Sequence, residues 1–237
     1  MQTNNQKNAP VITIDGPSGS GKGTISCLLA QKLGWNFLDS GVLYRALAYA
    51  FVASPEYLPS KEENIAELIS QLRVECSCEK GKVEACTRVF LRGEEVTLLL
   101  RGEECGIMAS KIAAEPKIRA ALLEWQREFA KEPGLIADGR DMGTVVFPNA
   151  ELKIFLWASA EIRAERRYKQ LKELGISVSL SKILEDLVAR DERDSKRSLA
   201  PLLPASDAIF IDATKLSIEE VLQKIMDEAT KKQIYRM

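Results

Sequence analysis

The sequence has 237 residues, of which 46% are hydrophobic and 28% charged, and its formal net charge is −1. This composition supports a substantial core and excludes a disordered chain, and the balanced charge argues against a general binder of nucleic acid or membrane surfaces. No apolar run approaches the roughly 18 residues of a membrane span, and the polar residues 1–10 lack the apolar core of a signal peptide. We therefore expect a cytoplasmic protein of one domain with insertions, or of two small domains.

Histidine is absent from the sequence, which excludes Ser-His-Asp and Cys-His catalysis and any histidine-ligated catalytic metal. The five cysteines show no regular framework, and without an export signal we expect reduced thiols. Cys76 and Cys78 would share one face of a strand, with Cys86 opposite on a hairpin. A zinc site there lacks a fourth ligand, so packing as small apolar residues is favoured over metal binding.

The first predicted elements are a buried strand at Val11–Ile14 and a helix at Thr24–Leu33. The turn between them fits G-x-x-x-x-G-K-x-T, in which Gly23 stands where Ser or Thr is usual and Thr24 comes one position later. Glycines let backbone N–H groups face a polyphosphate at the positive end of a helix, and Lys22 adds a point charge. The predicted phosphate-binding residues are Gly16, Pro17, Ser18, Gly19, Ser20, Gly21, Lys22, Gly23 and Thr24.

A second strand is predicted at Trp35–Leu38 and a helix at Val42–Val52, with Arg45 on its first turns. Asp39 or Ser40 would cap this helix. Capping alone explains both residues, although a cap and a ligand-binding hydroxyl can coexist. Proline residues end the helix.

The hydrophobic pattern changes in the next part of the sequence. A helix at 61–72 is followed by segments that alternate with period two, at 73–77, 83–91 and 95–97, separated by turns at 79–81 and 92–94. This pattern predicts a small antiparallel sheet inserted into the chain. It carries no catalytic constellation, so we interpret it as a wall or cover.

Helices are then predicted at 103–114 and from the break at Pro116 to Lys131, with Ser110 and Arg119 on either side of the break. A third strand, Leu135–Asp138, leads into the loop Gly139–Gly143. Ligands of open α/β sheets bind at the carboxyl ends of the strands, so Arg140 and Asp141 of this loop are candidate site residues. The alternative is an exposed turn with an internal ion pair.

The remaining elements are strands at 152–157 and 208–212, and helices at 160–174, 180–197 and after Ser217, where Ser-Ile-Glu-Glu forms a capping box. Arg190, Arg193, Asp194 and Arg197 recur at i, i+3, i+4 and i+7 and share one helix face. Three guanidiniums with one carboxylate exceed what a solvated face needs, which favours an anion-binding role. A salt-bridged surface face is the alternative.

The order of elements predicts an α/β fold, a doubly wound parallel five-stranded sheet flanked by helices. A nucleoside triphosphate on the loop and a second anion near the arginines imply phosphoryl transfer, which depends on positioning and charge neutralisation. If the acceptor is itself a phosphate, no general base is required. Mg²⁺ would bridge the triphosphate and take at most the Thr24 hydroxyl and the Asp138 carboxylate, directly or through water, with Asp15 a weaker candidate.

Four motifs together closely resemble bacterial cytidylate kinases, which are nucleoside monophosphate kinases with a phosphate-binding loop. They are residues 16–24, Leu38-Asp-Ser-Gly41 with Tyr44-Arg45, residues 136–148, and Arg190-Asp-x-Arg-Asp-x-x-Arg197. The resemblance runs from about Val11 into the final helix. It implies one kinase domain over 1–237, with an acceptor-binding insert at about 61–108 and a helical lid at about 176–200.

The resemblance also implies an activity and residue roles. ATP would phosphorylate CMP or dCMP with Mg²⁺ as cofactor, and the enzyme would be a monomer without nucleic-acid or membrane partners. Ser40 and Arg45 would hold the acceptor, Arg45, Arg140 and Arg197 its phosphate, Ser110, Arg119 and Asp141 its cytosine, and Arg190 and Asp194 its sugar. Arg193 would belong to the lid over ATP, and the catalytic residues would be Lys22, Arg140, Arg190 and Arg197.

Two rival functions remain open from the residues. One is a kinase for another small acceptor, such as AMP or shikimate. The other is a nucleotide-dependent switch, which would need a guanine-reading N-K-x-D element that this sequence does not contain.

Overall fold

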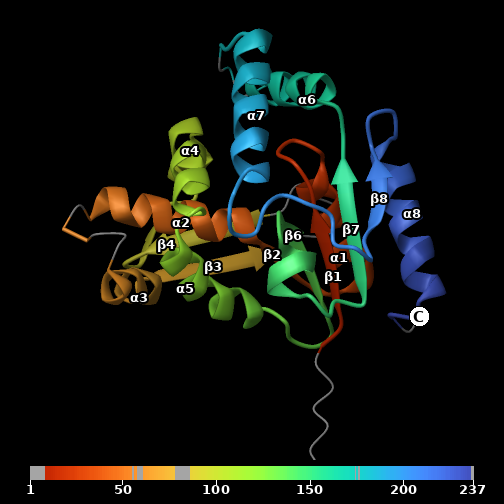
Figure 1. Cartoon of the computed structure of the whole chain (residues 1–237), viewed down its shortest axis with the longest axis horizontal. Helices are drawn as coiled ribbons and strands as arrows, with labels where there is room; N and C mark the ends of the chain where they lie inside the picture. Colours follow the sequence, from red (N-terminus) through yellow and green to blue (C-terminus); the bar gives the residue numbers. More distant parts are fainter. Residues whose placement is uncertain are drawn as a thin grey trace, which may run out of the picture.

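A parallel five-stranded sheet forms the centre of the molecule, in a computed structural model that describes residues 9–54, 56–57, 61–77, 86–173, 175 and 177–235. The strand order is β2-β6-β1-β7-β8, and all four neighbouring pairs are parallel (Figure 1). The predicted doubly wound sheet is thereby confirmed. The strands are β1 (Val11–Asp15), β2 (Asn36–Asp39), β6 (Leu135–Gly139), β7 (Leu152–Trp157) and β8 (Ile209–Asp212).

Each face of this sheet packs against its own layer of helices. Ile12 and Ile14 point to a core shared with α1 (Lys22–Leu33) and α8 (Ile218–Lys231), whereas Val11 joins a core with α2 (Ser40–Ala53) and α5 (Pro116–Arg127). Successive side chains of a strand alternate between faces, so a strand buried on both faces is apolar throughout. All five residues of β1 are buried accordingly, and Thr13 and Asp15 are its two polar members.

A further core lies beside the sheet. It joins α2, α3 (Glu62–Ser70), α4 (Glu103–Ile112) and α5 to the predicted antiparallel sheet, and it includes Leu47, Ile65, Leu68, Val89 and Leu122. That sheet has the order β3-β4-β5, with β3 at Leu72–Ser77, β4 at Cys86–Leu91 and β5 at Glu94–Glu95. The predicted turn at 79–81 and Cys78 lie outside the described residues.

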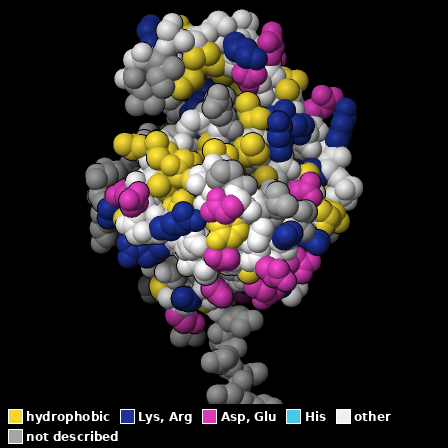
Figure 2. Space-filling view, turned by 90° about the vertical axis from the view of Figure 1, so that its left-hand side faces the viewer, with side chains coloured by type: hydrophobic (Ala, Val, Ile, Leu, Met, Phe, Trp, Pro, Cys, Tyr) yellow, Lys and Arg dark blue, Asp and Glu magenta, His cyan; other side chains and the backbone are white. Residues whose placement is uncertain are grey.

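Helices α6 (Ala160–Glu173) and α7 (Leu180–Ser195) stand above the carboxyl ends of the strands, and α7 also contacts α4 (Figure 1). They pack on each other through a small core of Ala164, Ile183 and Leu187. Figure 2 shows that the surface is hollowed between this upper part and the body of the molecule, and that positive and negative side chains are interspersed. Among the described residues, no helix is both long and apolar enough to cross a membrane.

Local signals explain where the helices begin. The Asp39 side chain caps α2 by accepting the N–H of Val42 at 3.2 Å, and Ser217 and Glu220 form the predicted capping box of α8. Pro116 occupies the first turn of α5, where a missing N–H is harmless. The helix after the phosphate loop begins at Lys22, two residues before the predicted Thr24, and Gly21 in the left-handed conformation is its N-cap.

Candidate active site

The loop between β1 and α1 can form only with glycine at several positions. A Cβ on Gly16 would lie 2.0 Å from the backbone oxygen of Leu156, so no side chain fits there. Gly19 and Gly21 adopt φ angles of +78° and +96°, which other residues rarely adopt. The loop therefore packs tightly on β7 and brings its backbone to the positive N-terminus of α1.

Lys22 opens α1 and is buried, and its Nζ donates to the carbonyl of Pro17 at 3.1 Å. Burial lowers the pKa of Lys22 to about 8, the charges of Arg140 and Arg190 act in the same direction, and Asp138 opposes them. The charge of Lys22 thus interacts with charged groups from the loop after β6 and from α7. The predicted donor-side lysine and the predicted acceptor-side arginines therefore share one electrostatic environment.

A cleft of about 1060 Å³ opens in front of this loop. Its walls are loop residues 18–24, arginines of α6, Arg190 of α7 and the start of α8 at Ser217, and Arg45 of α2 also lines it. The volume is in the range of small-molecule sites, and its phosphate end is cationic. Arg193, predicted to face the donor, is exposed and is not among the residues that line the cleft.

Asp15, the last residue of β1, holds the loop after β6 by hydrogen bonds. Its two carboxylate oxygens accept the N–H groups of Met142 and Gly143, each at 2.8 Å. Burial raises the pKa of Asp15 to about 7, although these two hydrogen bonds oppose the rise. Asp15 therefore fixes the loop that carries Arg140 and Asp141 at the carboxyl edge of the sheet.

Arg119 of α5 and Asp141 form a buried ion pair at one end of the site. The Arg119 guanidinium also donates to the carbonyl of Ala113 at 3.2 Å and lies 6.0 Å from the centre of the Tyr44 ring. Burial raises the pKa of Asp141, and the charges of Arg119 and Arg197 oppose the rise. The pair presents a carboxylate and guanidinium donors together, as a base with both donor and acceptor groups requires.

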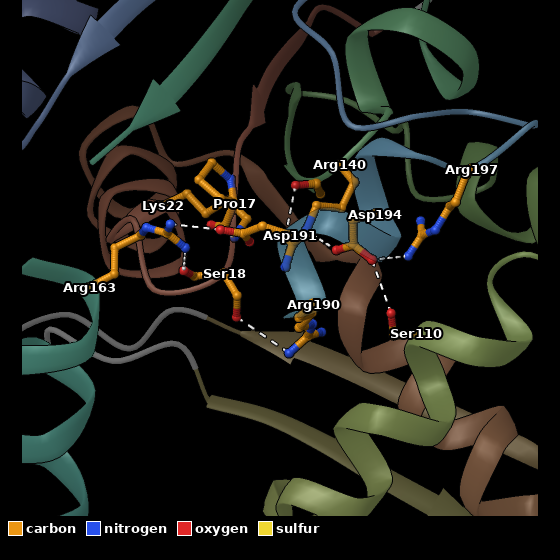
Figure 3. Close-up of polar contacts among 11 residues, drawn as sticks. Pro17, Ser18, Lys22, Ser110, Arg140, Arg163, Arg190, Asp191, Asp194 and Arg197 are labelled. Atoms are coloured by element: carbon orange, nitrogen blue, oxygen red, sulfur yellow. Dashed lines mark hydrogen bonds and ion pairs between the residues drawn. The ribbon is translucent and has the colours of Figure 1, made fainter. Parts of the chain in front are cut away.

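Asp194 of α7 is the centre of a second network, drawn in Figure 3. It accepts from Ser110 Oγ at 3.0 Å, from Arg140 Nε at 3.1 Å and from Arg197. Burial alone would raise the pKa of Asp194, but the guanidiniums of Arg140, Arg197 and Arg190 outweigh it and hold the pKa below its usual range. Ser110, which is predicted to read cytosine together with Arg119 and Asp141, thus belongs to the hydrogen-bond network of Asp194.

Arg45 and Ser40 complete the set of predicted acceptor residues. Arg45 Nη1 donates to the carbonyl of Leu100 at 2.7 Å, and a Cβ on Gly106 would lie 3.1 Å from Arg45 Nη2 and 3.7 Å from Arg190 Nη1. The two guanidiniums therefore lie close together beside Gly106 of α4. Ser40 is buried, and its Oγ lies 2.6 Å from the position of a Cβ on Gly139.

The residues proposed for a magnesium ion differ in how free their oxygens are. Both oxygens of Asp15 are engaged by backbone N–H groups. The oxygens of Asp138 accept no hydrogen bond from residues that the structure describes, and Asp138 Oδ2 lies 3.4 Å from the position of a Cβ on Gly23. Burial raises the pKa of Asp138 to about 7, opposed by Lys22. No cluster of three or more acidic or cysteine residues suits a metal within the described ranges.

Two arginines of α6 contact the phosphate loop and were not singled out from the sequence. Arg163 Nη1 donates to the carbonyl of Ser18 at 2.9 Å, and Arg166 Nη1 donates to that of Ser20 at 3.2 Å. Their i, i+3 spacing on the helix after β7 is the one signal that could have found them. Asp191 of α7 pairs with Arg163 Nη2 at 2.7 Å.

Comparison with known proteins decides among the phosphate-loop kinases. The sequence model of one family, described as cytidylate kinase, matches residues 12–231. The chain belongs to the cytidylate kinase family.

Relatives within the cytidylate kinase family cover nearly the whole chain. A cytidylate kinase of Pseudomonas fluorescens is 56% identical over 93% of this chain and 95% of its own length, and one of Pseudomonas putida is 55% identical over 95% and 98%. The solved structure of an Acinetobacter baumannii shikimate kinase with shikimate covers 95% of both chains, at 15% identity and a TM-score of 0.45. That likeness is too distant to bear on the function.

Proposed function

We propose that the protein transfers the γ-phosphoryl group of ATP to CMP or dCMP, which yields ADP and CDP or dCDP. Membership of the cytidylate kinase family is the observation that carries this proposal. The geometry supports it, because Arg140 and Arg190 lie close enough to Lys22 for their charges to lower its pKa. Two anionic nucleotides can therefore meet among cations that all come from one chain.

On the donor side, the triphosphate lies against the phosphate loop, from Gly16 to Thr24. Backbone N–H groups of the loop and the N-terminus of α1 face its phosphates, and Lys22 neutralises charge that moves to the β–γ bridge. ATP would occupy the cleft of about 1060 Å³ in front of the loop. Arg193 of α7 would reach this ligand only after a rearrangement, because it is exposed outside the cleft lining.

On the acceptor side, cytosine is read by the Arg119–Asp141 pair. The exocyclic amine of cytosine donates to Asp141, and its ring N3 and O2 accept from Arg119. Uracil reverses the pattern at two atoms and leaves buried groups unpaired, so a site of this kind can discriminate by roughly 10⁴-fold. Ser110 contributes through Asp194, with which it shares a hydrogen bond of 3.0 Å.

The sugar and phosphate of the acceptor lie between α2 and α7. Asp194 and Arg190 hold the sugar hydroxyls, Ser40 lines the acceptor side, and Arg45, Arg140 and Arg197 neutralise the phosphate. An oxygen of the acceptor phosphate attacks the γ-phosphorus, and the bond between the γ-phosphorus and the bridging oxygen of the leaving ADP breaks. No proton has to be removed, because the attacking oxygen is already an anion. Arg140 and Arg197 are already oriented by Asp194 for this task.

Mg²⁺ fits the residues available here as the cofactor. Asp138 is buried and no described residue donates a hydrogen bond to its oxygens, and Thr24 is among the residues that line the cleft. One hydroxyl and one carboxylate suit an ion that keeps several waters and takes its other ligands from the triphosphate. When bound, the ion would neutralise negative charge on the β- and γ-phosphates.

The organisation of the chain supports a single kinase unit. We take residues 1–237 as one domain, residues 61–108 as its acceptor-binding insert and residues 176–200 as a lid, since β3–β5 form a sheet of their own and Arg190 of α7 lines the cleft. A monomer is sufficient for catalysis because every proposed site residue belongs to one chain. The free thiols of Cys27, Cys76 and Cys105 fit a reducing compartment such as the cytoplasm.

A coupled assay of ADP release tests the proposal. With ATP and Mg²⁺ we expect turnover with CMP and dCMP, and far lower kcat/KM with UMP and AMP. Shikimate as acceptor is the control for the nearest rival chemistry. Equal rates with AMP, or turnover of shikimate in place of CMP, would contradict the assignment.

A further inference from the structure

Arg163 of α6 is a buried arginine behind the phosphate loop. Each of its three nitrogens has a different acceptor: Nε donates to the carbonyl of Ala158 at 2.8 Å, Nη1 to that of Ser18 at 2.9 Å, and Nη2 pairs with Asp191 at 2.7 Å. Its side chain is 4% exposed. Figure 3 shows it approaching Ser18 from the side opposite Arg190. These three partners together fix the orientation of the Arg163 guanidinium.

The contact with Ser18 determines the direction of a loop N–H. In a trans peptide the carbonyl and the following N–H point in opposite directions, so a Ser18 carbonyl held by Arg163 turns the Gly19 N–H away from Arg163. A Cβ on Gly19 would lie 3.3 Å from Arg163 Cβ, so the helix backs directly onto this peptide. The Gly19 N–H therefore faces the cleft side of the loop, where anions bind.

Asp191 has the complementary task of holding the guanidinium. It is the neighbour of Arg190, whose Nη1 donates to Ser18 Oγ at 3.4 Å. One turn of α7 therefore contacts Ser18 in two ways. Arg190 donates to the Ser18 hydroxyl directly, and Asp191 acts on the Ser18 carbonyl through Arg163. Arg163 is not among the residues that line the cleft, whereas Arg166, which holds the carbonyl of Ser20, does line it.

We propose that Arg163 is a positioning residue that orients the Ser18–Gly19 peptide toward the phosphates of the donor nucleotide, and that Asp191 fixes its guanidinium. The proposal rests on the proposed function in one respect, namely that the donor is a nucleoside triphosphate. Lysine at this position keeps the charge but cannot reach three acceptors, because it lacks the planar fork of a guanidinium. Arginine is therefore needed for its shape.

The test compares Arg163→Lys and Asp191→Asn with a matched control, Glu192→Gln. Glu192 is exposed on the same turn of α7 and pairs with Lys196 at the surface. Steady-state kinetics are measured with ATP varied at saturating CMP and with CMP varied at saturating ATP. We expect Arg163→Lys to raise KM for ATP at least tenfold and Asp191→Asn about threefold, with KM for CMP within twofold of wild type in both. Glu192→Gln should match wild type.

A merely structural ion pair predicts a different result. If Arg163 only tied α6 to α7, its loss would displace Arg190, Asp194 and Arg197 together, and KM for CMP would rise as much as KM for ATP. That outcome, or an unchanged KM for ATP, overturns the proposal. If Arg163→Lys does not fold, as a thermal melt would reveal, Asp191→Asn decides by the same criterion.

A binding measurement separates this proposal from the proposed function. Calorimetric titration of each protein with ADP and with AMP needs no acceptor. We expect weaker binding of ADP to Arg163→Lys and the same binding of AMP, which lacks the β-phosphate. If wild type binds ADP but fails to turn over CMP, the proposed function fails while the role of Arg163 stands. Equal loss for ADP and AMP refutes the role of Arg163.

Discussion

Replacement of Asp194 by asparagine tests whether this carboxylate holds the acceptor arginines in place. The Asp194 side chain is 2% exposed, and those of Arg140 and Arg197 are 17% and 7% exposed, so solvent can replace little of what is lost. The asparagine would keep the shape of the side chain. It would lose the negative charge, and its NH₂ group would face a donor.

The magnitude follows from the number and kind of contacts. Asp194 accepts from two guanidiniums and from the Ser110 hydroxyl. A hydrogen bond to a charged group contributes about 1.5–3 kcal/mol, and removal of one partner from a buried ion pair costs about 3–5 kcal/mol. The amide oxygen of the introduced asparagine can still accept one of these bonds. We therefore expect the free energy of unfolding to fall by about 3 kcal/mol at pH 7.

Urea unfolding at several pH values is the assay, and the pH dependence has a definite sign. The guanidiniums hold the pKa of Asp194 below its usual range in the folded protein, despite burial. Its stabilising contribution is therefore complete above the unfolded pKa of about 4, and it is lost as the pH falls through the lower folded pKa. The difference between wild type and Asp194→Asn should shrink below about pH 4.

The matched control is Asp186→Asn on the same helix. Asp186 pairs with Lys182 at 2.8 Å at the surface, so its loss should change the stability by less than about 1 kcal/mol. Equal unfolding midpoints for wild type and Asp194→Asn would refute the reasoning. A difference that persists unchanged to pH 3 would show that the charge of Asp194 is not its source.

Three further predictions concern activity. Arg140→Ala should lower kcat/KM for CMP by roughly 30- to 1,000-fold, because a charge-assisted contact to phosphate contributes roughly 2–4 kcal/mol in the transition state; wild-type kinetics would remove Arg140 from the site. Asp141→Ala should reduce the preference for CMP over UMP in a competition assay, because the site loses the carboxylate that accepts a hydrogen bond from the exocyclic amine of cytosine. An unchanged ratio would mean that the base is read elsewhere. In the free protein Lys22 has a pKa of about 8, so kcat/KM for ATP should fall above that pH, and Lys22→Arg should abolish this limb.

Much of the fold could be predicted because its signals are local. The run from Val11 to Ile14, the glycine loop and the following helix occur in the order that a phosphate site needs, and the structure has them in that order. The loop after β6 could be predicted from topology alone, since carboxyl ends of parallel strands meet at one edge. Element ends differ by up to four residues, as at α5, which was predicted to reach Lys131 and ends at Arg127.

The contacts within the site were harder to predict because they are long-range. Arg163 and Asp191 occur among many charges on polar helices, and nothing local marks them as a pair that reaches Ser18. The helical repeat placed Arg193 on the face of Arg190 and Asp194, but Arg193 is exposed whereas Asp194 is buried. Periodicity identifies a stripe, and only the packing of α7 decides which side of the stripe is covered.

The separation between two of the hydrophobic cores has a consequence for how this architecture can diversify. One core, around Ile12 and Ile14, supports the strands and the glycine loop, and the other, around Leu47, Ile65 and Val89, supports the small antiparallel sheet. Substitutions that reshape the second need not disturb packing in the first. Natural variation or laboratory evolution could thus exchange one phosphate acceptor for another while the machinery that grips the triphosphate is inherited intact.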